Sequence, residues 1–189
     1  MIRLDTNKVQ IFAKRLLAEV DGRIIISKDQ PSFELVSNFL DWMNIANKDQ
    51  FLKKTSITYK NYIVTPYIPG ISNKYWSLRS QVTNLAHECV HVLQYRSNPN
   101  FLAEYALILN NRTNYEIEAM KPEIELYYHL AGKPINISKL LNRLSYYNLK
   151  EKNLKYASRA LYTYSRVTRG GKLVGSAIGK KAIKILNSL

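Results

Sequence analysis

The sequence is poor in cysteine, and Cys89 is the only one. A single cysteine excludes a disulfide within the chain and is typical of a reducing compartment. Long apolar runs are lacking as well. No segment approaches the roughly 18 apolar residues that a membrane-spanning helix needs, and charges interrupt residues 1–20, where a signal peptide would be continuously apolar. We therefore expect a cytoplasmic or virion-associated protein without a signal peptide or a transmembrane segment.

Acidic residues are scarce: 14 Asp and Glu stand against 28 Lys and Arg, for a formal net charge of +14. The imbalance is concentrated at one end, because Glu151 is the only acidic residue from Lys139 onwards. Hydrophobic residues make up 46% of the chain, which is enough for a core and excludes a disordered protein. We predict a folded domain over residues 1–134 and a basic helical extension over residues 135–189, with GKP at 132–134 as the boundary.

Apolar spacing predicts an α+β fold that is mostly helical. Helices are expected after Asp5 or Thr6, from Pro31, after Ser77, over 101–109 and after Ser138. The β-branched and aromatic segment 56–70 is the best strand candidate, and 23–27 is a short strand or extended turn. Segment 114–132 also has a helical pattern, but Pro122 should kink or break it.

Histidine is scarce too, and two of the three histidines lie in the stretch HECVH, residues 87–91. Positions i and i+4 share one face of a helix, so His87 and His91 can bind the same metal ion. Glu88 would then reach a water molecule rather than the metal. Zinc lowers the pKa of such a water to about 7, and the carboxylate accepts its proton as it attacks a carbonyl. The alternative is a buried amphipathic helix with two chance histidines.

HECVHVLQYR, followed by NYEIEA at 114–119, resembles the gluzincin-type zinc metallopeptidases over roughly residues 56–131. The resemblance implies a zincin-like core, with a small sheet beside the motif helix and Zn²⁺ as the cofactor. It implies that His87 and His91 are metal ligands and that Glu88 is the general base. Glu116, with Ala119 three residues later, matches the third ligand of the E-x-x-A motif.

Other residues compete for roles at this site. Glu118 is the nearest rival third ligand, since it lies two positions further along the same segment. Glu104 and His129 are weaker candidates, and His129 better fits a packing role at a helix end. Gln94 could orient a ligand or bind substrate, or be a surface amide. Tyr115 could stabilise an oxyanion or simply pack in the core.

The basic region 139–189 has two interpretations. It could bind a polyanion, either nucleic acid or an anionic membrane, or attach to an assembly partner. It could equally be a solvated basic face. In its last part Val174, Ile178, Ile185 and Leu189 fall near one helical face, which suits an interfacial helix or a terminal helix docked on the body.

Two functions follow from these patterns. The first is a zinc-dependent metallopeptidase that hydrolyses peptide bonds with Glu88 as general base. The second is a structural or interaction protein, such as a phage virion component, on a metallopeptidase-like scaffold attached through its basic C-terminal region. A working base distinguishes them, because a scaffold does not need one.

Overall fold

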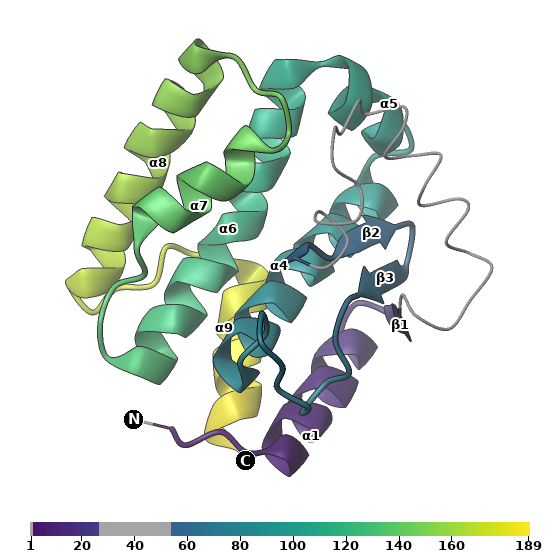
Figure 1. The fold of residues 1–189 in the computed structure, drawn as a ribbon, viewed down its shortest axis with the longest axis vertical. Coiled ribbons are helices and arrows are strands. Elements are labelled where there is room, and N and C mark those ends of the chain that lie inside the picture. The colour runs from purple at the N-terminus through teal and green to yellow at the C-terminus, as the bar shows by residue number, and fades with distance from the viewer. Residues whose placement is uncertain (1, 27–53) are drawn as a thin grey trace.

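The structure, a computed structural model, describes residues 2–26 and 54–189. Helices dominate, and a small sheet lies against them (Figure 1). The described helices are α1 (Thr6–Ala18), α4 (Leu78–Ser97), α5 (Phe101–Leu107), α6 (Leu109–Ala131), α7 (Ile137–Ser145), α8 (Glu151–Arg169) and α9 (Ala177–Asn187). The strands are β1 (Arg23–Ile26), β2 (Ile57–Tyr59) and β3 (Tyr62–Thr65). The mostly helical α+β class is confirmed, while the helix expected from Pro31 lies outside the described residues.

The sheet has the order β1-β3-β2, with β1 parallel and β2 antiparallel to β3. The prediction of one strand over 56–70 was therefore wrong, since this segment forms the β2–β3 hairpin. Lys60 makes the reversal possible by adopting a left-handed backbone with φ of 55°. The turn could not be recognised in the sequence, because it lacks the usual glycine and strand-forming residues lie on either side of it. The hairpin places β2 against α4.

Helices α1 and α4 begin directly after their predicted capping residues, Asp5 and Ser77. The Lys8 amide donates to the Asp5 carboxylate over 2.9 Å at the start of α1. At the start of α4, the Ser80 amide donates to the Ser77 hydroxyl over 3.2 Å. Each cap satisfies a backbone donor that the first turn leaves without a partner.

Helix α6 runs through Pro122 without ending there, so of the predicted kink or break, the break is wrong. A proline inside a helix removes one backbone hydrogen bond and costs about 3 kcal/mol. Burying a large apolar side chain returns about 1.5–3 kcal/mol. Met120, Ile124 and Leu126 flank the proline and are each at most 1% exposed. Burial of the side chains on both sides of Pro122 therefore outweighs the cost of the lost hydrogen bond. Because the helix continues, Glu116 and Glu123 stay on one helix at a fixed spacing.

Two apolar clusters share α6. One combines Ile117 and Met120 of α6 with Leu140, Leu144 and Leu161 of α7 and α8. The other combines Leu126 and Leu130 of α6 with α1, α4 and α9. The helices beyond residue 134 thus pack on the same central helix as the earlier ones. The division at 134 stays a prediction.

The C-terminal region differs from expectation at its start. Asn136, not Ser138, caps α7, because the Ser138 amide donates to the Asn136 side chain over 3.0 Å. The basic helical stretch after it is divided into α7 and α8, with Asn148 in the left-handed conformation between them. The Asn136 side chain bonds locally to the backbone, and asparagine tolerates the positive φ of 53° that Asn148 adopts.

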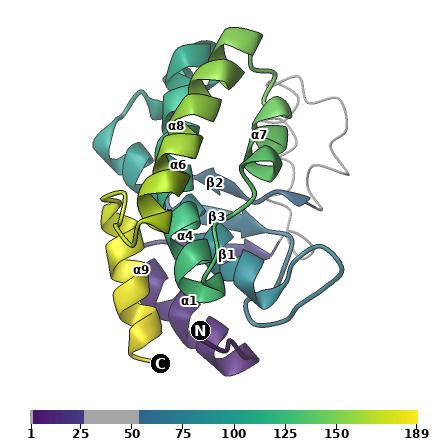
Figure 2. The same ribbon diagram turned by 90° about the vertical axis from the view of Figure 1, so that its left-hand side faces the viewer.

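Helix α9 is docked on the body of the protein (Figure 2). Ile178, Ala182 and Leu186 are buried against α1, α4 and α6. Ile185 is only partly buried. Across residues 2–26 and 54–189, the structure contains no helix with the length and apolarity needed to cross a membrane.

We expect Gly179→Ala to destabilise the protein by about 1–2 kcal/mol. A Cβ on Gly179 would overlap the buried carboxylate of Glu125. This carboxylate accepts a 3.0 Å hydrogen bond from the Gly175 amide, which holds the segment before α9 in place. Overpacking of this kind costs about 1–3 kcal/mol, and the helix preference of alanine returns only part of it. Urea unfolding measures the change. Gly170→Ala is the control, because a Cβ there meets nothing closer than 3.4 Å; equal stability of the two variants would contradict the prediction.

Candidate metal centre

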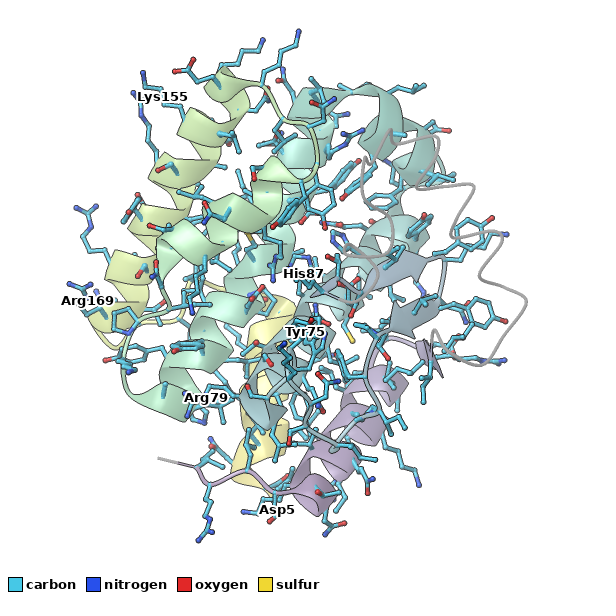
Figure 3. The ribbon with its side chains drawn as sticks, viewed as in Figure 1. Asp5, Tyr75, Arg79, His87, Lys155 and Arg169 are labelled. Carbon is cyan, nitrogen blue, oxygen red and sulfur yellow. The ribbon has the colours of Figure 1, made fainter. Side chains whose placement is uncertain are left out.

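The two motif histidines and a glutamate from another helix meet inside the protein. His87 and His91 lie one turn apart on α4, and Glu116 comes from α6, which packs along α4. All three side chains are buried, with Glu116 fully inaccessible. Figure 3 shows His87 near the centre of the molecule. Among the described residues, this is the one group of histidine, cysteine and carboxylate side chains arranged closely enough to hold a metal ion.

The distances within the group match those of a tetrahedral metal site. His87 Nε2 lies 3.2 Å from His91 Nε2. Glu116 Oε2 lies 3.5 Å from His87 Nε2, and Glu116 Oε1 lies 3.4 Å from His91 Nε2. Zinc bonds of about 2.0–2.1 Å at tetrahedral angles would place the ligand atoms about 3.3–3.4 Å apart. The three residues therefore fit one small cation and leave a fourth position for another ligand.

One carboxylate oxygen of Glu116 has no hydrogen-bond partner. Oε1 accepts a 2.5 Å hydrogen bond from the Tyr105 hydroxyl. Oε2 is buried and has no hydrogen-bond partner. Burial raises the pKa of Glu116, but hydrogen bonds and charges from His87 and His91 outweigh it and hold the pKa well below its usual range. A buried, ionised oxygen without a partner is costly unless a cation meets it.

An ion pair between Glu123 and Arg143 contacts His87 at Nδ1, the ring nitrogen that faces away from Glu116. This Nδ1 lies 3.5 Å from Glu123 Oε2, and Arg143 donates to both oxygens of Glu123 over 3.1 and 2.5 Å. Arg143 Nη2 also lies 3.4 Å from Nδ1. If Nε2 is free to bind a metal, Nδ1 carries the hydrogen and donates to Glu123, so Glu123 accepts from both neighbours. Carboxylates commonly orient metal-binding histidines in this way.

His91 is oriented by an amide instead. Its Nδ1 lies 2.7 Å from Gln94 Oε1, and the Gln94 amide group donates to the Tyr115 carbonyl over 3.1 Å. Since that second bond identifies the Gln94 oxygen as the atom facing His91, the imidazole must donate from Nδ1. In their neutral, metal-binding form both histidines would thus turn an unprotonated Nε2 toward Glu116. Of the two roles considered for Gln94, orientation of His91 matches these contacts.

The carboxylates around His87 also change its protonation. Burial lowers the pKa of His87, but hydrogen bonds that His87 donates to Glu116 and Glu123, together with the charge of Glu116, outweigh this and raise the pKa to about 9. Without a cation in the group, His87 therefore holds a second proton at neutral pH. Binding of a metal must displace that proton, because a histidine ligand is neutral.

Glu88 is buried beside this group and held by two residues. The Thr58 hydroxyl, on β2, donates to Oε2 over 2.8 Å, and the Asn84 amide donates to Oε1 over 3.3 Å. Asn84 is itself fixed by hydroxyl groups of Ser56 and Tyr67, which donate to it over 2.6 and 3.0 Å. Glu88 lies about 100° around the helix from His87. Its position is therefore set jointly by α4 and by the hairpin.

The rival residues lie elsewhere. Glu118 is half-exposed and pairs with Lys121 over 2.6 Å. Glu104 accepts a 2.6 Å hydrogen bond from the Tyr115 hydroxyl, so neither of these side chains joins the metal group. His129 lies near the end of α6, partly buried and with Nε2 2.9 Å from Asn187 Oδ1, as expected of a packing residue. The structure thus brings Glu116, and not Glu118, to the histidines.

Five residues around the centre were missed in the sequence: Tyr105, Glu123 and Arg143, and also Thr58 and Asn84, which hold Glu88. Glu123 had a detectable signal, because it lies seven residues after Glu116 and two helical turns place both on one face. Arg143 and Tyr105 had none. Their positions follow from the packing of α7 and α5 around α6.

Comparison with known proteins adds nothing to this geometry: the chain matches no family model, no curated protein and no solved structure.

Proposed function

We propose that the protein is a zinc-dependent metallopeptidase. The observation that carries the proposal is the buried group His87, His91 and Glu116, whose ligand-to-ligand distances of 3.2–3.5 Å suit tetrahedral zinc. Two imidazole nitrogens and one carboxylate are a zinc ligand set of the catalytic type, with one position left open. The resemblance of HECVH and NYEIEA to gluzincin motifs supports hydrolysis of peptides as the reaction.

Each residue has a distinct task in this proposal. Zinc, when bound, supplies a Lewis acid that lowers the pKa of water to about 7. His87, His91 and Glu116 hold it, while Glu123 and Gln94 keep the two imidazoles in the required tautomer. Glu88 takes a proton from the attacking water as the oxygen bonds to the peptide carbonyl carbon. It then gives that proton to the departing amine nitrogen as the C–N bond breaks.

One observation favours the alternative, a structural or interaction protein on a metallopeptidase-like scaffold. Both oxygens of Glu88 already accept hydrogen bonds, from Thr58 and Asn84. A carboxylate in such a network can serve packing alone. The alternative predicts that the metal site is filled and that no peptide is cleaved.

We expect the purified protein to contain about one zinc ion per chain, as one His₂Glu site requires. Elemental analysis measures it, before and after dialysis against a chelator and reconstitution with Zn²⁺. Cleavage of an unfolded protein substrate should disappear with the metal and return with it. A His91→Ala variant is the control that should not recover on reconstitution. If neither the purified nor the reconstituted protein holds metal, the proposed function is wrong.

A further inference from the structure

One face of α8 carries a row of exposed cationic and aromatic side chains. Its members repeat at spacings of three and four residues along the helix, so they share one side: Lys152, Lys155, Tyr156, Arg159, Tyr162, Arg166 and Arg169. We call this row the α8 stripe. Residues 153, 157, 161, 165 and 168 face the opposite way and are buried. At a rise of 1.5 Å per residue, the α8 stripe is about 25 Å long.

The α8 stripe lies on the outside of the molecule. In Figure 2 α8 is at the front, with α6 behind it and α7 to one side. In Figure 3 two members of the α8 stripe are labelled along the left edge: Lys155, near the start of α8, and Arg169, at its end. Tyr156 and Tyr162 are each 55% exposed, so their rings are open to a ligand. Glu151, at the start of the helix, is the only acidic residue from Lys139 to the end of the chain.

A cavity of about 450 Å³ adjoins the C-terminal end of the α8 stripe. It is formed by residues 135–137, at the start of α7, and by Tyr162, Thr163, Ser165, Arg166 and Arg169 of α8. Arg166 and Arg169 are one turn apart and exposed. The cavity therefore combines two guanidinium groups, hydroxyl groups and an aromatic ring within one concave site.

We propose that the α8 stripe and this cavity bind single-stranded nucleic acid. Guanidinium groups in the cavity recognise a phosphate, and the cations along the helix follow the phosphates of one strand. Tyr162 and Tyr156 stack on unpaired bases, a contact that a duplex does not offer. This surface goes beyond the metal centre and does not depend on the reaction proposed there.

The same residues disfavour an anionic membrane as the partner. Membrane-surface helices insert an apolar face beside their cationic one. The apolar sides of α8 and α9 are already buried, in the cores shared with α6. What the α8 stripe exposes is charge and tyrosine, which suits a flexible polyanion with stacking bases.

The test is fluorescence anisotropy of a labelled 20-nucleotide thymidine oligomer, titrated with the full chain over a range of salt concentrations. We expect binding at low salt that Arg166→Ala/Arg169→Ala weakens at least about tenfold. Losing two phosphate contacts should also reduce the slope of log affinity against log salt by about 1.4. Tyr162→Ala should weaken binding at least about fivefold, and Tyr162→Phe should retain it.

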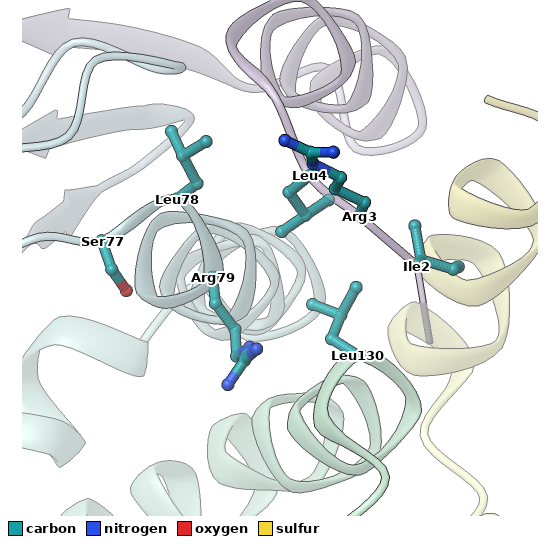
Figure 4. Close-up of a pocket in the computed structure, with 7 residues that line it drawn as sticks. All are labelled: Ile2, Arg3, Leu4, Ser77, Leu78, Arg79 and Leu130. Carbon is teal, nitrogen blue, oxygen red and sulfur yellow. The ribbon is translucent and has the colours of Figure 1, made fainter.

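The matched control is Arg3→Ala/Arg79→Ala, which removes the same charge from a different cavity. That cavity, of about 540 Å³, is lined by Ile2, Arg3, Leu4, Ser77, Leu78, Arg79 and Leu130 (Figure 4). Its two guanidinium groups point in different directions, and that of Arg79 lies 5.6 Å from the Tyr127 ring. Equal weakening by the control pair would overturn the proposal. So would absence of binding at low salt, or binding to phosphatidylserine vesicles but not to the oligomer.

Discussion

Glu88→Gln is expected to retain the metal while peptide cleavage falls by about two to four orders of magnitude, the usual contribution of a general base. Glutamine has nearly the same shape, so its carbonyl oxygen can still accept the 2.8 Å hydrogen bond from Thr58. What it cannot do is take a proton from water. Cleavage rates and zinc content, measured on the same sample, separate the loss of the base from the loss of the site.

The control is Glu118→Gln, a change of the same chemistry at a half-exposed position on α6. It should leave both cleavage and zinc unchanged. If Glu88→Gln cleaves as fast as the parent protein, Glu88 is not the base and the mechanism proposed above is wrong. If the parent protein holds zinc and cleaves no peptide at all, the scaffold alternative is the better account.

Arg143→Met is expected to cost about 3–5 kcal/mol of the free energy of unfolding, measured in urea on metal-free protein. The side chain of Glu123 is only 7% exposed, and Arg143 donates to both of its oxygens. Burial raises the pKa of Glu123, but the charges and hydrogen bonds of Arg143 and His87 together outweigh it and bring the pKa to about 2. Removing one member of a buried pair leaves the other charge without compensation.

Two further variants test that reason. Lys139→Met removes an exposed cation from the same helix and should change the stability by no more than about 0.5 kcal/mol. Glu123→Leu/Arg143→Met removes the whole pair and should be more stable than Arg143→Met alone. Because Glu123 orients His87, zinc affinity of Arg143→Met should also fall by about 10–100-fold. A loss of stability below about 1 kcal/mol in Arg143→Met would contradict the prediction.

The position of Arg143 shows that α7 contributes to the candidate metal centre. Arg143 comes from α7, which lies beyond the predicted boundary at residue 134, and it contacts the pair His87 and Glu123. The neighbouring Tyr147 has its pKa raised well above the usual range, by burial first and then by the charge of Glu116, which places it close to the same carboxylates. Removal of residues 135–189 would therefore expose the centre as well as remove the basic surface.

Interactions within one or two helical turns could be predicted from the sequence. The caps Asp5 and Ser77 bond to amides three residues later, as their types and positions indicate. The four-residue spacing of His87 and His91 puts them on one face whatever surrounds the helix. Glu116 was found from a motif, and Glu123 could have been found from its two-turn spacing. Such features depend on helix geometry alone, which a short stretch of sequence specifies.

The other features were decided by the tertiary structure, because they depend on which helices and strands pack together. Pro122 stays inside α6 since buried neighbours outweigh one lost hydrogen bond, and Lys60 turns the chain since the two strands pair. Thr58 and Arg143 reach Glu88 and His87 across 30 and 56 positions in the chain. No local pattern encodes contacts at such separations. The sequence alone placed His87 and His91 on one face of a helix. Only packing around α6 brought Glu116, Glu123 and Arg143 to them, and with these residues the hydrogen bonds and charges of the candidate metal centre.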